Sequence, residues 1–109
     1  MKPETQTIII HSMDFILRNM THLRVLRNAI VLETLLTVCK KPGLFLTETT
    51  RIVGGSKNAV MSAIEHLIKI GLIKEEREKE FPRRRLLFPT EKGKRIGELL
   101  EKIDEILSE

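Results

Sequence analysis

Three consecutive arginines and a pair of small polar side chains are the residues whose types and spacing best suit chemistry. Arg83, Arg84 and Arg85 carry planar guanidinium groups, which bind phosphate oxygens through two parallel hydrogen bonds. Asn58 and Ser62 are four residues apart, so a helix places them on one face. An asparagine can bond to two atoms on the major-groove edge of adenine, and a serine can donate to or accept from base edges. These residues therefore predict contact with a nucleic acid.

A predicted helix over residues 56–70 positions the two small polar residues; Ser56 caps it and Gly71 ends it. At about 100° per residue, its apolar side chains gather on one side and must face the core: Val60, Ala63, Ile64 and Leu67. The candidates for nucleic-acid contact lie at its start and away from that core side: Ser56, Lys57, Asn58, Met61 and Ser62. A solvated helix face with no partner, which Glu65 favours, stays open as the alternative.

The three arginines belong to a predicted two-stranded hairpin. An extended run covers 72–79, Phe81-Pro82 supplies a turn, and a second strand covers 84–88. Two apolar side chains share one face of the second strand: Leu86 and Phe88. An arginine here can enter a minor groove or hold a phosphate. The alternative is cross-strand pairing, which would neutralise the cluster, with the acids of the first strand and turn: Glu76, Glu78 or Glu80. Because neighbouring strand residues point to opposite faces, both interpretations can hold at once.

A short helix over 48–53 precedes the helix of 56–70, and Gly54-Gly55 separates the two. A short helix, a tight turn and a second helix form the helix-turn-helix pattern. Hydroxyl groups near the start of the first helix can contact phosphate, which positions a protein on DNA without specifying a sequence. The candidates are Thr47, Thr49 and Thr50. Thr47 could equally serve only as the cap of its helix.

Two longer helices flank this motif. The first is predicted from Thr21 to Lys41, and its apolar residues repeat at steps of three and four to form a buried stripe: Leu23, Leu26, Ile30, Leu32, Leu35, Leu36 and Cys39. The second runs from Thr90 to Leu107, and its stripe follows a heptad pattern: Ile96, Leu99, Leu100, Ile103, Ile106 and Leu107. A helix this short needs a partner surface, so we expect it to form a homodimer. Its outer face is acidic, which suits a place away from DNA.

Length and composition exclude several classes of protein. The 109 residues suffice for one domain, and 41% apolar with 31% charged residues predicts a globular chain. We expect a cytoplasmic protein, because no apolar run is long enough to span a bilayer and no secretion signal is visible. The single Cys39 excludes a disulfide framework, and the histidines are not spaced as a metal pair, so neither metal nor cofactor is expected. No catalytic motif indicates an enzyme.

Three junctions carry a resemblance to a known family. Leu46-Thr47-Glu48 opens the first helix of the motif, and Ser56 to Lys74 spans its second helix, the glycine stop and the start of a wing strand. Phe88-Pro89-Thr90-Glu91-Lys92-Gly93 forms the step from strand to helix. Over 29–100 the chain resembles the winged helix-turn-helix domain of small archaeal transcription regulators related to the MarR and ArsR families. It departs from them at the hairpin tip, which lacks the usual glycine, and in lacking the paired cysteines of the ArsR metal site.

The resemblance implies an α+β fold, mainly helical, with a two-stranded wing and a C-terminal dimerisation helix. We assign 1–20 to an N-terminal segment that is either helix or strand and goes with the dimer, 21–90 to the DNA-binding domain, and 91–109 to dimerisation. The implied partners are double-stranded DNA and a second copy; the sequence does not identify a small-molecule effector. Two other functions remain open: a winged helix used for protein–protein contact, and an architectural DNA-coating protein with little sequence preference.

Overall fold

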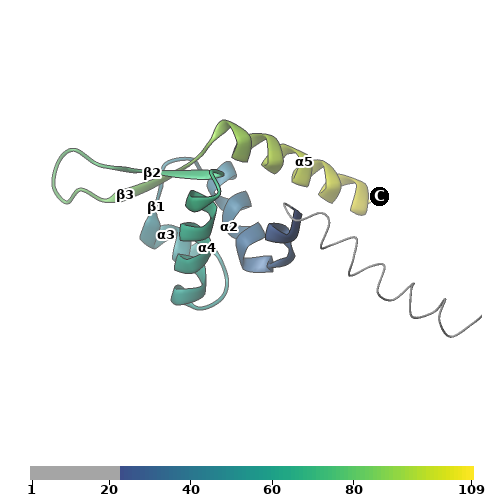
Figure 1. The fold of residues 1–109 in the computed structure, drawn as a ribbon, viewed down its shortest axis with the longest axis horizontal. Helices are drawn as coiled ribbons and strands as arrows, with labels where there is room; N and C mark the ends of the chain where they lie inside the picture. The colour runs from purple at the N-terminus through teal and green to yellow at the C-terminus, as the bar shows by residue number, and fades with distance from the viewer. Residues whose placement is uncertain (1–22) are drawn as a thin grey trace, which may run out of the picture.

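The computed structural model describes residues 23–109, so the N-terminal segment 1–20 and the expected cap Thr21 lie outside the described residues. The elements follow the order of a winged helix (Figure 1): η1 (Leu23–Arg27), α2 (Ala29–Lys40), β1 (Leu44–Phe45), α3 (Leu46–Ile52), α4 (Lys57–Lys69), β2 (Ile73–Arg77), β3 (Arg85–Pro89) and α5 (Glu91–Leu107). This is the predicted α+β winged-helix fold. Within 23–109, no helix combines the length and apolar character needed to cross a membrane.

The sheet has three antiparallel strands in the order β1-β3-β2. β2 and β3 form the predicted hairpin, with Ile73 opposite Pro89 and Arg77 opposite Arg85. The short β1 adds to the other edge of β3, where Leu44 lies opposite Leu87. The hairpin is therefore fastened to the segment that joins α2 to α3, and it projects from the helices on the side away from the free end of α5 (Figure 1).

The helix that ends at Lys40 begins later than the sequence predicts. Asn28 has an extended backbone, and its side-chain oxygen accepts a hydrogen bond from the amide of Ile30 at 2.9 Å. Asparagine competes for backbone amides in this way, which makes it a better cap than an interior helix residue. As a result α2 starts at Ala29, and the separate 3-10 turn η1 precedes it.

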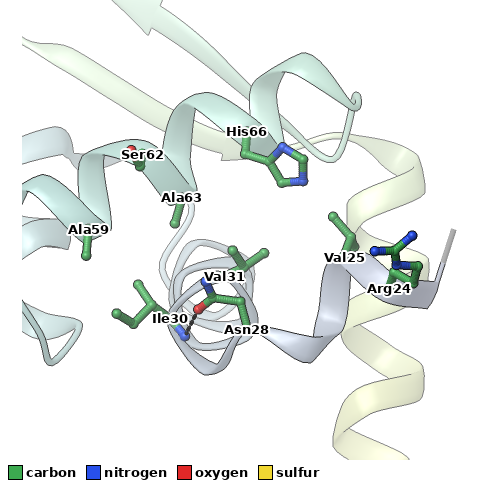
Figure 2. Close-up of a pocket in the computed structure, with 9 residues that line it drawn as sticks. All are labelled: Arg24, Val25, Asn28, Ile30, Val31, Ala59, Ser62, Ala63 and His66. Carbon is green, nitrogen blue, oxygen red and sulfur yellow. Dashed lines mark hydrogen bonds between the residues drawn. The ribbon is translucent and has the colours of Figure 1, made fainter. Parts of the chain in front are cut away.

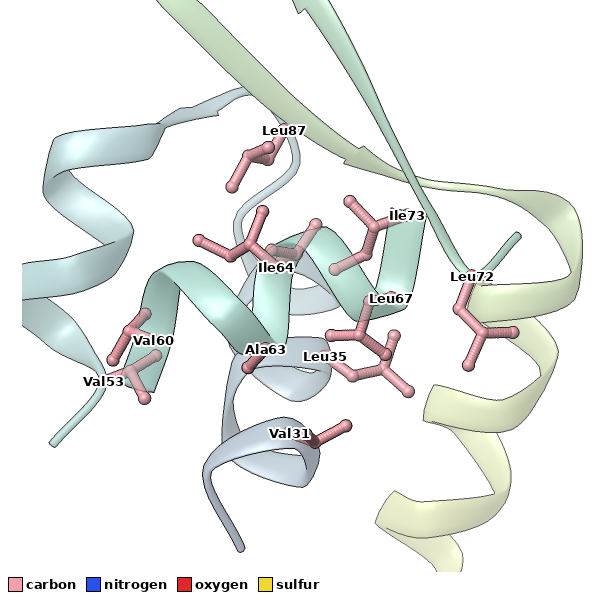
Figure 3. Packing of buried hydrophobic residues seen from close by; sticks show 11 residues of the cluster. Val31, Leu35, Val53, Val60, Ala63, Ile64, Leu67, Leu72, Ile73 and Leu87 are labelled. Carbon is pink, nitrogen blue, oxygen red and sulfur yellow. The ribbon is translucent and has the colours of Figure 1, made fainter. Parts of the chain in front are cut away.

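The core gathers around α4, which contributes the four predicted residues (Figure 3). Its members among residues 23–109 are Val31, Leu35, Val38, Val53, Val60, Ala63, Ile64, Leu67, Leu72, Ile73 and Leu87. On α2 the predicted stripe is partly right: Leu35 is fully buried and Ile30 and Cys39 pack against the core, but the prediction missed the buried Val31 and Val38. Leu32 and Leu36 are half-buried instead, on the side of α2 that faces α5. Apolar residues occupy nearly the whole circumference of α2, so their spacing alone could not select the buried side.

Leu86 and Phe88 share one face of β3, as predicted, and are half-buried, whereas the buried residues of the strand are Leu87 and Pro89. Successive side chains of a strand alternate between its two faces, so burying Leu87 turns both neighbours outward. The outer face still carries packing, because a Cβ added at Gly43 would lie 3.4 Å from the ring of Phe88. The strand is therefore apolar on both faces, and only the face of Leu87 joins the core.

Helix α5 packs closely against the rest of the molecule at two glycines, Gly93 and Gly97. Thr90 caps it as predicted, since its hydroxyl accepts a hydrogen bond from the Gly93 amide at 3.0 Å. A Cβ at Gly93 would overlap the carbonyl oxygen of Leu72, and one at Gly97 would come within 2.8 Å of Cys39 Sγ. Cys39 of α2 is half-buried where α2 meets α5, and this burial raises the pKa of its thiol. The backbone contact requires that α5 carry no side chain at Gly93, whereas a side chain at Gly97 would have to displace the thiol of Cys39.

We expect Gly93→Ala to lower the free energy of unfolding by roughly 1–3 kcal/mol, because the added methyl group forces backbone apart at Leu72. The loss should appear even though alanine is the better helix former by about 1 kcal/mol. Urea denaturation followed by circular dichroism measures it. Gly54→Ala is the matched control, since a Cβ there meets nothing within 4 Å. Equal stability of Gly93→Ala and the unchanged protein would contradict the close packing.

Candidate nucleic-acid interface

Helix α4 presents the predicted polar face to solvent. Ser56 caps it, with its hydroxyl accepting a hydrogen bond from the Ala59 amide at 3.1 Å, and Gly71 ends it with a φ of +80°. Lys57, Asn58 and Ser62 are exposed, together with Glu65 and Lys69, while Met61 is half-buried. The predicted candidates of this helix therefore lie within reach of a ligand, and its acidic Glu65 is exposed among them.

Only one of the three candidate threonines of α3 remains exposed. The helix begins at Leu46, so Thr47 lies in its first turn and is exposed rather than acting as the cap. Thr49 is fully buried, and its hydroxyl donates to the carbonyl oxygen of Phe45 at 3.1 Å. This corrects the expectation for Thr49, whose side chain faces the core and cannot reach DNA. Thr50 is half-buried and donates to the carbonyl oxygen of Thr47 at 2.7 Å, so its hydroxyl proton is used within the helix.

Two of the three predicted arginines have acidic partners within the hairpin. Arg84 Nε lies 3.1 Å from Glu78 Oε1, and its guanidinium stacks 3.9 Å from the ring centre of Phe45. Arg85 pairs with Glu75, which accepts a hydrogen bond from it and so raises the pKa of the arginine. The prediction of acidic partners is partly right. Glu78 was among the predicted acids, but Glu75 was not, and the strand register places Glu75 diagonally across from Arg85.

Arg83 differs from its two neighbours. It is exposed, has no acidic partner among residues 23–109, and takes a left-handed φ of +56°. Its amide donates to the carbonyl oxygen of Glu80 at 2.8 Å, which closes the turn. An arginine thus occupies the conformation that a glycine usually takes, and the tip forms an ordered turn without one.

A groove between the hairpin and α3 collects the basic residues. It has a volume of about 250 Å³ and is lined by Phe45, Leu46, Thr47, Arg77, Arg83, Arg84 and Arg85. Four guanidinium groups there meet only two partner carboxylates, those of Glu75 and Glu78. Sequence reasoning missed Arg77, which the strand register places opposite Arg85. The excess positive charge suits a phosphate group.

A second pocket of about 360 Å³ lies beside α4, against η1 and the start of α2 (Figure 2). Its walls are Arg24, Val25, Asn28, Ile30, Val31, Ala59, Ser62, Ala63 and His66. Ser62 is therefore both a candidate for base contact and part of this rim. No sequence pattern predicts the pocket, because its two walls are far apart along the chain and meet only through packing.

The six candidate dimerisation residues of α5 divide into two groups. Ile96 and Leu100 pack against the chain's own core, which corrects their assignment to a partner surface. Leu99, Ile103, Ile106 and Leu107 are 51–77% exposed and form an apolar strip. Beside the strip, α2 and α5 enclose a groove of about 370 Å³, whose apolar wall includes Leu32 and Leu36. Among residues 23–109, no cluster of side chains is suited to hold a metal ion.

No protein-family model and no curated protein matches the chain. Solved structures do match its fold. A MarR structure has a TM-score of 0.66 at 27% identity, covering 94% of this chain and 74% of its own. A transcriptional regulator homologue from Pyrococcus horikoshii OT3 has a TM-score of 0.68 at 15% identity, covering 84% and 93%.

FabT from Streptococcus pneumoniae, solved in complex with DNA, has a TM-score of 0.66 at 14% identity, covering 98% of this chain and 79% of its own. The chain thus has the winged-helix fold of MarR-family transcription regulators, archaeal ones included. The matched structures are regulators rather than enzymes.

Proposed function

We propose that this chain is a sequence-specific, double-stranded DNA-binding transcription regulator that acts as a homodimer. One observation carries the proposal: α3, which packs against α4, also forms a wall of the arginine groove. The exposed polar face of α4 and the groove therefore belong to adjoining elements, as a ligand that touches both requires. FabT, whose structure contains DNA, has the same fold and supports the assignment.

In this proposal α4 enters the major groove. Asn58 and Ser62 bond to base edges and so read sequence. Lys57 and the amides at the start of the helix favour a phosphate, because the helix dipole is positive there. Thr47 contacts the backbone from α3, which fixes position without adding sequence preference.

The hairpin contributes charge through two classes of arginine. Arg77 and Arg83 are exposed and have no acidic partner among the described residues, so each can neutralise a phosphate directly. Arg84 and Arg85 already bond to carboxylates, so a phosphate must displace Glu78 or Glu75 to reach them. We therefore assign most of the hairpin's electrostatic contribution to Arg77 and Arg83.

The exposed strip of α5 supports a second copy as partner. The four exposed apolar side chains lie on one face of the helix, and covering them with a partner would remove apolar surface from water. Exposed apolar patches of this kind mark protein interfaces. A twofold pairing through this strip gives the assembly two copies of α4. On a near-palindromic site they would enter successive major grooves about 34 Å apart.

Asn58→Ala combined with Ser62→Ala should weaken binding to a selected operator by tenfold or more. Neither side chain is charged, and each hydrogen-bonded pairing with a base edge is worth on the order of 1–3 kcal/mol of discrimination. Fluorescence polarisation with duplexes selected from a random pool measures the affinity. Binding to random DNA should stay nearly constant. Lys57→Ala is the contrasting variant and should weaken both duplexes alike. Equal losses for the double variant would favour the architectural DNA-coating function.

Arg77→Ala with Arg83→Ala should reduce the slope of log affinity against log salt by about two units per subunit, because each phosphate that a side chain neutralises contributes about 0.9. Arg84→Ala with Arg85→Ala removes the same charge and is the matched pair. Its slope should change by less than about one unit, since both groups are held by carboxylates. A larger change in slope for Arg84→Ala with Arg85→Ala than for Arg77→Ala with Arg83→Ala would show that Arg84 and Arg85 bind the phosphates instead. If the protein shows no salt-dependent binding to duplex DNA, the protein–protein function would be favoured.

Leu99→Glu or Ile103→Glu should convert the dimer to a monomer, because either change buries a charge in the proposed interface. Light scattering at micromolar concentration gives the mass. Glu105→Lys, an exposed change on the polar side of the same helix, should leave the dimer intact. An unchanged protein that runs as a monomer would rule out the homodimer.

A further inference from the structure

The most exposed of the large apolar side chains in the described part of the chain is Phe81, at 94%. It lies in the loop that joins β2 to β3, and this end of the hairpin projects away from the helices (Figure 1). The tip is ordered rather than loose: the Glu78 amide donates to the Arg84 carbonyl oxygen at 3.0 Å, and the Arg83 amide to Glu80 at 2.8 Å. A fixed turn therefore holds an aromatic ring in water, and packing against residues 23–109 does not account for its position.

The charge around the ring identifies the kind of surface it meets. Residues 77–85 contain five basic side chains and two acidic ones. Arg83, two residues from Phe81, is exposed and without an acidic partner among the described residues. An apolar ring surrounded by cations suits a partner that is negatively charged outside and apolar inside. Stacked base pairs beneath a phosphate backbone have this character.

We propose that Phe81 is a wedge that enters the minor groove of duplex DNA and separates two base pairs. The inference rests on the proposed function and adds a second source of specificity to it. Phenylalanine is among the apolar side chains that can insert between base steps and kink a duplex. Arg83 would lie in the groove beside it, where the negative potential is strongest when the groove is narrow.

This wedge makes the hairpin sensitive to DNA stiffness. Pyrimidine–purine steps such as TA unstack easily, whereas A-tracts resist deformation. The hairpin would therefore select the base step under its tip without any hydrogen bond to a base. In a homodimer the two tips would impose this preference symmetrically, outside the bases that α4 reads.

Tryptophan at position 81 provides a direct test, because the chain contains no Trp or Tyr. In Phe81→Trp, binding to the selected duplex should quench the emission by at least half, since the ring stacks on bases. Glu109→Trp, at the exposed residue beyond the end of α5, should show no change. Unchanged emission of Phe81→Trp on a duplex that it binds would overturn the wedge and leave the proposed function standing. A blue shift with anionic phosphatidylglycerol vesicles, and none with DNA, would overturn the wedge in favour of a membrane contact.

The second measurement compares Phe81→Ala with Phe81→Leu, both at a side chain too exposed to affect folding. Energy transfer between dyes at the two duplex ends reports bending. Phe81→Ala should bend DNA less and lose fivefold or more in affinity when a TA step lies under the tip, and it should lose little on an A-tract. Phe81→Leu should retain most of both properties, because leucine also acts as a wedge. Normal bending and affinity in Phe81→Ala would overturn the proposal. Failure of the unchanged protein to bind any duplex would overturn the proposed function as well.

Discussion

Strand β3 is paired on both edges, and this double pairing fixes the hairpin relative to the helices. On one side it meets β2 over five residue pairs, and on the other it meets β1, which leads directly into α3. Leu87 lies at the centre of the strand with its side chain fully buried, so the sheet is also anchored to the core. The stacking of Arg84 on Phe45 adds a side-chain contact across the same junction. The arginine groove exists only because these contacts hold the strand against α3.

Features set by local chemistry could be predicted from the sequence. Ser56 and Thr90 cap the helices that follow them, and Gly71 ends α4, because each depends on residues only a few positions away. The core side of α4 was also predictable, since its polar and apolar residues segregate cleanly. These local features suffice to define a helix-turn-helix followed by a hairpin and a last helix.

Features set by packing could not be predicted in the same way. Helix α3 begins at Leu46, two residues earlier than predicted, and Thr49 is buried because it lies on the side of α3 that packs against the core. The partner of Arg85 is Glu75 because the strand register places Arg77 directly opposite, and like charges in that position repel. Ile96 and Leu100 pack against the core because the glycines of α5 let the helix approach closely. Each of these depends on a neighbour that is distant in sequence.

Thr90 connects three parts of the molecule through its own hydrogen bonds. Its amide donates to Leu72 and its hydroxyl donates to Gly71 at 2.7 Å, in the turn that ends α4, while the same hydroxyl caps α5. These hydrogen bonds hold the start of α5 in a fixed orientation relative to the end of α4, so the two helices should move together. In a homodimer paired along α5, the angle at which the two α5 helices cross would set the separation of the two α4 helices. A small rotation at the pairing surface would become a larger displacement at Asn58, a full helix length away. The range of operator spacings that the protein tolerates would then be decided by the stiffness of a single threonine junction, far from any base.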